Sequence, residues 1–282
     1  MEEELLSLMK DMAREAGRIA LGLIDDSDPT FKSDQSVLTK ADMQISRHIR
    51  DKLKDLLSTP EHILIDEEDA ASGKHFDQAA LDKVPYVWVV DPIDGTRSFS
   101  NRMPLFGISL GVLKELKPWL GVVYFPLLNE LFFSNGTDAY FVEGAFSDKE
   151  KATVIKPLDQ TITQQAAFLS SDAFFKEFDW DFDFCQITMP SCAVIDLCWP
   201  AIGRGCGGFF KANLWDFAGS WPIFQAAGLQ LRSLATGKPL ERVDTSLFIG
   251  AGIKTWKLKE HYVLSSKRNF PLLKAKIRPR AK

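Results

Sequence analysis

The strand-like run Tyr86–Val90 and the turn after it constrain this chain more than any other feature. The run is aromatic and β-branched, as buried strands are, and it leads directly into Asp91-Pro92-Ile93-Asp94-Gly95-Thr96. Pro92 restricts its own φ to about −65°, and Gly95 permits backbone conformations that other residues resist. We therefore expect Asp91 and Asp94 on a stiff loop at a strand's end. Asp, Pro and Gly also favour turns for conformational reasons alone, so a purely structural turn is the alternative.

Two further segments place acids in a similar setting. The apolar run Ile63–Ile65 leads into Asp66-Glu67-Glu68, and Asp216 begins a predicted helix over 216–227, as its N-cap, with a bend expected at Pro222. If the fold brings Glu67, Asp91, Asp94 and Asp216 together, each pair at about 4 Å repels by about 4 kcal/mol at an effective dielectric of about 20. Such a cluster needs cations, and an all-oxygen set without His or Cys favours Mg²⁺.

The composition is that of a globular protein with a large core. Of 282 residues 45% are hydrophobic, enough for one large domain or two packed halves, with Ser147–Lys151 as the expected boundary. The formal charge of −4 offers no basic field for a nucleic acid polymer. The stretch 267–282 contains seven Lys and Arg and no acid, and we expect it to be solvated.

The chain shows no targeting or membrane segment. Met1 is followed by three glutamates, and no apolar run approaches the roughly 18 residues of a membrane span, so we expect a cytoplasmic protein that does not enter a membrane. The four cysteines form no Cys-x-x-Cys pair, and we interpret them as reduced thiols in or near the core.

The order of elements predicts two different halves. Apolar residues at helical spacing predict a helix that ends near Asp25 and a second one from about Asp42 to Leu56. Apolar runs between 106 and 142 then predict a meander of antiparallel strands. Beyond residue 148 strands alternate with helices, which is typical of an α/β layer.

The acidic segments together resemble the inositol monophosphatase family. The family pattern Asp-Pro-Ile-Asp-Gly-Thr-x-x-Phe is matched from Asp91 to Phe99, and Glu67 and Trp215-Asp216 match its other acidic segments. The resemblance implies a layered αβαβα sandwich, an antiparallel sheet in 1–147 and a mixed α/β layer in 148–282. It also implies one catalytic unit over 1–282, a lithium-sensitive homodimer, and two or three Mg²⁺ ions acting on a small phosphate monoester.

The resemblance also implies a role for each site residue. Glu67 and Asp91 with the Ile93 carbonyl would hold one metal ion, and Asp91, Asp94 and Asp216 a second. Thr96, paired with Asp42, would position the attacking water, and the backbone N–H groups of Gly95 and Thr96 would hold phosphate oxygens. Lys32 matches a family lysine near the metals. For Asp42 the alternative is a capping box with Thr39, and for Lys32 a surface position.

The chain departs from the family at the substrate wall. Asp66 replaces a glycine, so its carboxylate would either strengthen the metal site or face solvent. The family's Arg-Ser-x-Gly-Ser-Ala-Ala segment is replaced by Thr188–Val194, in which we expect Ala193 to contact substrate. The acid expected before Trp-Asp is missing from Phe209–Leu214, where Lys211 either is exposed or favours a second anionic group on the substrate.

These features predict a Mg²⁺-dependent phosphomonoesterase, with inositol monophosphate as the first expected substrate. Histidinol phosphate, fructose 1,6-bisphosphate and a 3′-phosphonucleotide are the alternative substrates, and a non-catalytic relative is the alternative class. A haloacid-dehalogenase phosphatase is excluded, because its nucleophilic Asp stands two positions before the second Asp, whereas Asp91 and Asp94 are three apart.

Overall fold

The first sheet determines where the acidic segments lie. The computed structural model describes residues 2–26, 30–31, 37–158, 161–250, 252 and 255–280. Seven strands run in the order β3-β4-β5-β6-β7-β8-β9, and only β3 and β4 are parallel. They span His62–Asp66, Tyr86–Asp94, Gly107–Lys114, Lys117–Phe125, Glu130–Ser134, Ala139–Glu143 and Lys151–Ile155. Because β3 and β4 are parallel neighbours, their carboxyl ends, and the acids there, meet at one edge of the sheet.

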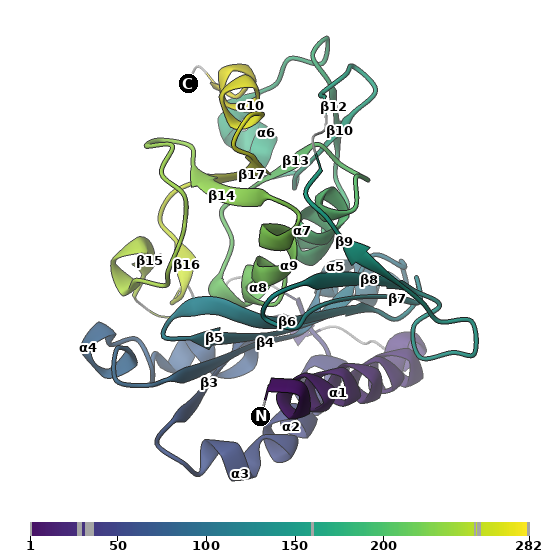
Figure 1. Ribbon diagram of the computed structural model, residues 1–282, viewed down its shortest axis with the longest axis vertical. Coiled ribbons are helices and arrows are strands. Elements are labelled where there is room, and N and C mark those ends of the chain that lie inside the picture. The colour runs from purple at the N-terminus through teal and green to yellow at the C-terminus, as the bar shows by residue number, and fades with distance from the viewer. Residues whose placement is uncertain are drawn as a thin grey trace.

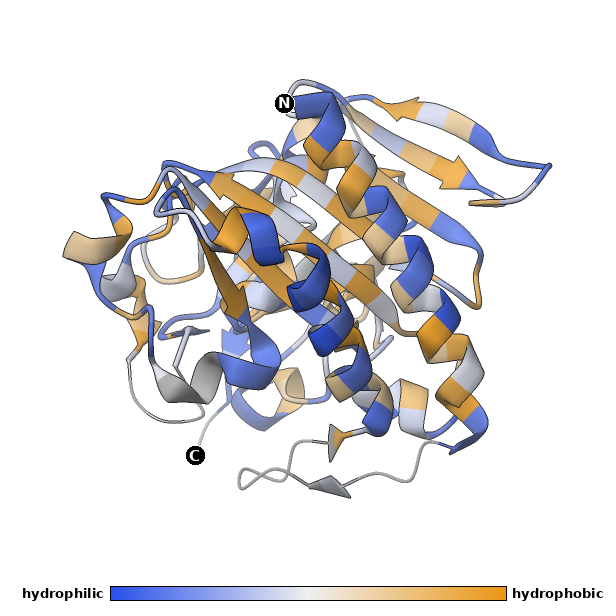
Figure 2. Cartoon of the chain, turned by 90° about the horizontal axis from the view of Figure 1, so that it is seen from below, coloured by the Kyte–Doolittle hydropathy of each residue, from blue (hydrophilic) through white to orange (hydrophobic). Residues whose placement is uncertain are grey.

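Two N-terminal helices cover one face of this sheet. They are α1 (Glu2–Leu23), which contacts β5 and β6, and α2 (Lys40–Lys52), which contacts β4 and is followed by the single turn α3 (Lys54–Leu57). Their apolar sides are buried against the strands, and hydrophilic residues dominate the outward sides seen in Figure 2. Both predicted helices are therefore present, the second with a break at Leu53.

Three helices cover the opposite face of the sheet: α7 (Ala193–Ala201), α8 (Leu214–Ala218) and α9 (Trp221–Ala226). The single helix predicted over 216–227 is wrong, because the chain breaks between α8 and α9. Pro222 lies in the first turn of α9, where its missing N–H group costs no hydrogen bond, so it begins a helix rather than bending one.

A second, mixed sheet packs on the other side of these helices. Its strand order is β12-β10-β13-β17-β14, with β10 parallel to β12 and β13 and with β17 antiparallel to β13 and β14. The strands span Gln186–Thr188, Ala167–Leu169, Gly207–Phe210, Tyr262–Ser266 and Leu229–Ser233. Beyond it lie α6 (Phe174–Glu177) and α10 (Phe270–Lys276), so Figure 1 shows the predicted succession of α, β, α, β and α layers. Buried apolar clusters fill the spaces between the layers.

Short elements connect these layers. The strands among them are β1 (Thr30–Phe31), β2 (Val37–Leu38), β11 (Phe178–Asp179), β15 (Phe248–Ile249), β16 (Lys257–Leu258) and β18 (Arg278–Pro279). The helical turns are η1 (Ile24–Asp26), η2 (Glu67–Ser72), α4 (Gln78–Leu81), α5 (Thr96–Ser100) and η3 (Thr245–Leu247). No described helix is long and apolar enough to cross a membrane.

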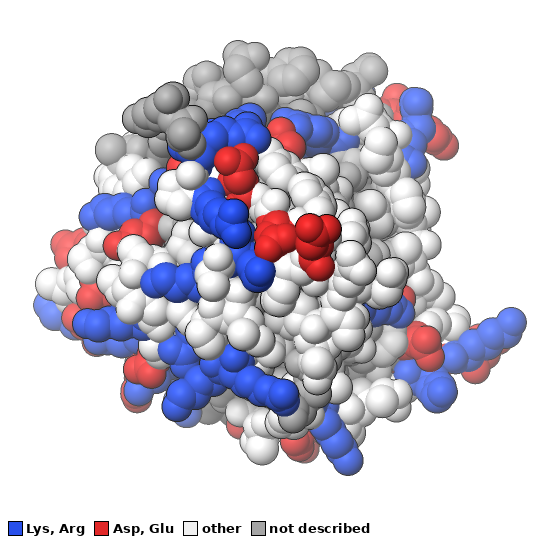
Figure 3. Space-filling model, turned by 90° about the horizontal axis from the view of Figure 1, so that it is seen from above, with Lys and Arg blue, Asp and Glu red and all other residues white. Residues whose placement is uncertain are grey.

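Two segments differ from the sequence expectations. The charged passage Ser147–Lys151 connects two strands of one sheet, because β9 pairs with β8. The basic stretch after residue 267 is not a free tail: its described part forms α10 and β18, and Leu273 is buried. Lys276 and Arg280 form ion pairs with Asp181 and Asp179, and on the face in Figure 3 acidic side chains lie among the basic ones.

Candidate metal centre

The acidic motif at 91–96 ends β4 and begins α5. Asp91 and Asp94 are buried, and the pairing of β4 with β5 shifts in register between them, so the strand bulges here. Gly95 has a φ of +83°, and a Cβ atom there would lie 2.8 Å from the carbonyl oxygen of Leu105. Both its backbone conformation and its close surroundings require glycine, which restrains the loop that carries the two acids.

Asp216 reaches the same place from α8. It is the third residue of that helix and accepts a hydrogen bond from the backbone N–H of Asn213 at 2.7 Å. The predicted N-cap role of Asp216 is therefore wrong, because Asn213 is the N-cap and Asp216 completes its capping box. A Cβ atom on Gly111 of β5 would lie 2.7–2.8 Å from backbone atoms of Ala218 and Gly219, so α8 approaches the sheet closely here.

Asp91, Asp94 and Asp216 form one cluster, in which one carboxylate oxygen of each lies within 4.8 Å of the others. Burial raises the pKa of Asp91 well above its usual range, and the charges of Glu67, Asp94 and Asp216 raise it further. Burial, followed by the charges of Asp94 and Glu67, likewise raises the pKa of Asp216, and burial is the main cause that raises the pKa of Asp94 to about 6. The cluster cannot hold all of its negative charge unless cations neutralise it.

Glu67 lies beside this cluster rather than within it. It is the first residue of η2, directly after β3, and both its charge and its hydrogen bonding contribute to the raised pKa of Asp91. The neighbouring Asp66 is buried and accepts hydrogen bonds from Ser46 at 2.5 Å and from Arg50 at 3.0 Å. The Asp66 carboxylate therefore does not face solvent, which corrects that alternative. It lies outside the described acidic cluster, and a contribution of Asp66 to metal binding stays a prediction.

The donor set of the cluster suits a hard divalent cation. The Oδ1 atom of Asp91 is buried and has no hydrogen-bond partner in the part of the chain that the structure describes. An unpaired oxygen of a buried carboxylate is costly, and a cation supplies the partner it lacks. Because the three clustered groups are carboxylates, their chemistry fits Mg²⁺ better than a soft transition metal.

The residues expected to position water have structural partners. The hydroxyl of Thr96 donates to the Ile93 carbonyl oxygen at 2.9 Å. Asp42 is buried and accepts hydrogen bonds from the hydroxyl and backbone N–H of Thr39, at 2.5 and 2.8 Å, so the alternative capping-box role is present. The pairing of Asp42 with Thr96 stays a prediction. Lys32 lies outside the described residues.

Residues at the start of α7 donate hydrogen bonds to Asp94. The thiol of Cys192 and the backbone N–H of Val194 both donate to Asp94 Oδ2, at 2.9 and 2.8 Å, and the backbone of Ala193 also lowers the Asp94 pKa. The sequence indicated only a buried thiol at Cys192. All four cysteines are indeed buried and free, but nothing in the local sequence pointed to this contact.

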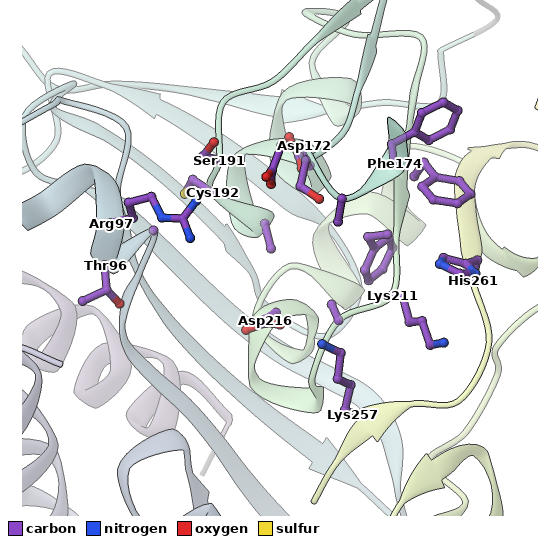
Figure 4. A pocket seen from close by; sticks show the side chains of 18 of the residues that line it. Thr96, Arg97, Asp172, Phe174, Ser191, Cys192, Lys211, Asp216, Lys257 and His261 are labelled. Carbon is purple, nitrogen blue, oxygen red and sulfur yellow. The ribbon is translucent and has the colours of Figure 1, made fainter. Parts of the chain in front are cut away.

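A cavity of about 430 Å³ adjoins the cluster. Gly95, Thr96, Ala193 and Lys211, for which the sequence predicted contacts with phosphate or substrate, line it together with Asp216. Figure 4 shows Thr96, Lys211 and Asp216 around it. It is also lined by residues that the sequence did not single out, among them Arg97, Asp196, Lys257 and His261. Its size suits a small metabolite. Lys257 and His261 were missed because they follow Asp216 by forty residues or more and no motif surrounds them.

Fold and site together define a layered αβαβα sandwich with a buried cluster of three carboxylates where β4 and α8 meet. A model of the inositol monophosphatase family matches residues 1–268, and the chain belongs to this family, whose members are hydrolases of phosphate monoesters.

Several individual proteins resemble the chain over most of its length. Inositol monophosphatase 1 of Solanum lycopersicum is 30% identical over 244 residues, which cover 80% of this chain and 83% of that protein. The 3′(2′),5′-bisphosphate nucleotidase CysQ of Escherichia coli strain K12 is 27% identical over 258 residues, covering 89% and 98%. The crystal structure of extragenic suppressor protein suhB from Bartonella henselae shares the fold, with a TM-score of 0.71 at 17% identity and coverage of 97% and 98%.

Proposed function

We propose that this protein is a Mg²⁺-dependent phosphomonoesterase that hydrolyses a small phosphorylated metabolite by direct attack of water. The observation that carries the proposal is the buried cluster of Asp91, Asp94 and Asp216, whose carboxylate oxygens approach within 4.8 Å beside a cavity of metabolite size. The orphaned Oδ1 atom of Asp91 supports a bound cation. Membership of the inositol monophosphatase family supports the reaction class.

Each residue of the site has a proposed role. Asp91 would be shared by two ions, with Glu67 and the Ile93 carbonyl on one side and Asp94 and Asp216 on the other. Bound Mg²⁺ would neutralise phosphate charge, lower the pKa of water and stabilise the departing alkoxide.

The protein's own groups would align the reactants. The Thr96 hydroxyl, supported by Asp42, would orient the water, while the backbone N–H groups of Gly95 and Thr96 would hold phosphate oxygens. Cys192 and Val194 would keep Asp94 oriented, since both donate to its Oδ2 atom. Ala193, Lys211 and Asp216 would contact the rest of the substrate from the cavity wall.

Inositol monophosphate is the first substrate to test, because the family and the tomato relative are named for it. A second candidate is a bisphosphorylated compound such as a 3′-phosphonucleotide or fructose 1,6-bisphosphate. Two observations favour it: Lys211 and Lys257 line the cavity, and Phe209 and Phe210 stand in the stretch where an acid was expected. The CysQ relative is named as a bisphosphate nucleotidase.

The decisive experiment measures phosphate release with and without Mg²⁺ from inositol 1-phosphate, histidinol phosphate, fructose 1,6-bisphosphate and adenosine 3′,5′-bisphosphate. We expect Mg²⁺-dependent release from at least one of them, abolished in Asp91→Asn and retained in Asp148→Asn, a matched change at an exposed acid. Equal turnover by wild type and Asp91→Asn would refute the metal assignment. Folded protein that releases no phosphate from any substrate would favour the non-catalytic alternative.

The family also leads us to propose a cytoplasmic homodimer that works as one catalytic unit over 1–282, binds two or three Mg²⁺ ions and is inhibited by Li⁺. Light scattering after size exclusion would report the mass, against 31.7 kDa for one chain. Isothermal titration with Mg²⁺ would report the number of ions, and assays in LiCl against equal NaCl would report the inhibition.

A further inference from the structure

Two lysines stand on neighbouring backbone segments of the cavity wall. Lys211 directly follows β13, and since Phe210 pairs with Tyr262 of β17, the next residues along the two strands are Lys211 and His261. Lys257 belongs to β16 and forms a β-bridge with Asn213, two residues after Lys211. Both lysines line the cavity that Asp216 also lines, and Figure 4 shows them on the Asp216 and His261 side of it.

Neither lysine forms an ion pair with a described acidic side chain. Other basic residues are paired, such as Arg204 with Glu130 at 2.7 Å, but the side-chain amines of Lys211 and Lys257 form no ion pair or hydrogen bond within the described part of the chain. Both are half-buried. The charges of both lysines act on His261. Burial is the main cause that lowers the pKa of His261, the charge of Glu177 raises it, and the charges of Lys211 and Lys257 lower it further.

Two acids that line the cavity, Asp172 and Glu177, have partners other than these lysines. Asp172 contacts Lys176 at 3.6 Å, and Glu177 lies 3.6 Å from His261. Lys257 lies near enough to lower the pKa of Asp216, although burial and the other acids keep that pKa raised. In a centre filled by cations this attraction between Lys257 and Asp216 would weaken, leaving both amines available to an anionic ligand.

We infer that Lys211 and Lys257 form a subsite for a second phosphate of the substrate, while the phosphate that is hydrolysed binds at the acidic cluster. The inference rests on the proposed phosphatase function. An ammonium group is a strong partner for phosphate, and a half-buried wall makes the attraction less screened than at the surface. A substrate with one phosphate and a neutral remainder would leave both charges without a counter-ion in a partly desolvated wall.

An aromatic layer supports this subsite. The rings of Phe209 and His261 stack with centroids 5.1 Å apart and planes at 17°, and Phe174 meets Phe209 edge-on at 4.8 Å. Phe209 is buried, and the three rings line the same cavity. They fix the backbone from which Lys211 extends, and an apolar ring wall does not repel a second phosphate as a carboxylate would.

Matched substrate pairs test the inference by kinetics. The pairs are adenosine 3′-phosphate with adenosine 3′,5′-bisphosphate, and inositol 1-phosphate with inositol 1,4-bisphosphate, so each pair differs only in the second phosphate. A charged hydrogen bond contributes roughly tenfold or more. We therefore expect wild-type kcat/KM to favour the bisphosphate of at least one pair by about tenfold to a hundredfold, mainly through KM.

Variants assign this preference to the two amines. The double variant Lys211→Gln, Lys257→Gln should lose the preference, so that its kcat/KM becomes equal within each pair, and replacement of both lysines by Arg should retain the preference. Lys117→Gln, Lys238→Gln removes the same charge at exposed sites outside the cavity and should behave as wild type. Equal kcat/KM within both pairs, or a preference that survives the double Gln change, would overturn the inference.

A binding measurement separates this inference from the proposed function. Calorimetric titration with Ca²⁺ in place of Mg²⁺, so that a hard cation fills the carboxylate centre, compares adenosine 3′,5′-bisphosphate with adenosine 3′-phosphate directly. The subsite requires tighter binding of the bisphosphate by wild type and a loss of that difference in the double Gln variant. If the wild type binds the bisphosphate and the monophosphate equally, the subsite is contradicted, even if all substrates are hydrolysed. If the wild type hydrolyses no substrate but binds the bisphosphate more tightly, only the phosphatase proposal is contradicted.

Discussion

The variant Asp91→Asn should be inactive and yet more stable than the wild type when metal is absent. The Asp91 carboxylate oxygen lies within 4.8 Å of those of Asp94 and Asp216, so one ionised pair repels by about 3 kcal/mol at an effective dielectric of about 20. If Asp91 instead takes up a proton at pH 8, that protonation costs free energy as well, since its ordinary pKa is about 3.9. Asparagine avoids both costs.

The amide that Asp91→Asn introduces also lowers stability, because its buried N–H groups would lack hydrogen-bond partners. This costs about 1–2 kcal/mol of the free energy of unfolding. The net gain is then about 1–2 kcal/mol, or about 2–8 °C in the melting temperature of a chain of this size. Thermal unfolding at pH 8 in EDTA and in Mg²⁺ measures it. Mg²⁺ should raise the melting temperature of the wild type but not of Asp91→Asn. A variant that melts lower than the wild type in EDTA and is stabilised equally by Mg²⁺ would refute the reasoning.

Three further predictions concern the surroundings of the cluster. Gly111→Ala should lower stability by about 1–3 kcal/mol and weaken Mg²⁺ binding, because the new Cβ atom would clash with the backbone of α8. Gly22→Ala has open space around it and should change stability by less than about 1 kcal/mol. Thermal unfolding and Mg²⁺ titration of both variants test this. Because the pKa of Asp94 is raised to about 6, a proton competes with the metal, and Mg²⁺ affinity should fall below about pH 6. The same raised pKa means that Asp94 stabilises the metal-free folded protein at pH values below its unfolded pKa. This contribution is lost as the pH rises through about 6. Calorimetry in two buffers should detect proton release on Mg²⁺ binding near pH 6, and equal affinity at pH 5 and pH 8 would argue against it. Arg50→Met should cost about 1–3 kcal/mol, measured by urea unfolding, because it removes the guanidinium from the buried Asp66, and an unchanged midpoint would contradict this.

The parts of the site that the sequence predicted are those encoded locally. The β-branched run before Asp91-Pro92-Ile93-Asp94-Gly95 predicted a strand, and Gly95 predicted a backbone conformation that other residues resist; the structure contains both. The expected loop at Asp91 and Asp94 is instead a continuation of β4 through a bulge. The capping box at Thr39 and Asp42 was likewise readable from its spacing. Helical periodicity predicted α1 and α2 for the same reason.

The parts that the sequence did not predict depend on long-range packing. Asp216 was assigned to an N-cap because the local pattern does not show that Asn213 takes that position. The contact of Cys192 with Asp94 joins residues 98 positions apart. Lys257 lines the cavity because β16 forms a β-bridge with the segment before α8, and no sequence motif near Lys257 predicts this contact.

A crystal structure of the protein with Mn²⁺ in place of Mg²⁺ and with inorganic phosphate would test the central claim most directly. Anomalous scattering would locate the metal independently of the phosphate. We predict Mn²⁺ peaks at coordination distance from Asp91, shared with Asp94 and Asp216, and phosphate in contact with both the metal and the backbone N–H groups of Gly95 and Thr96. A cluster without an anomalous peak under saturating Mn²⁺, or phosphate bound elsewhere, would contradict the metal-assisted mechanism.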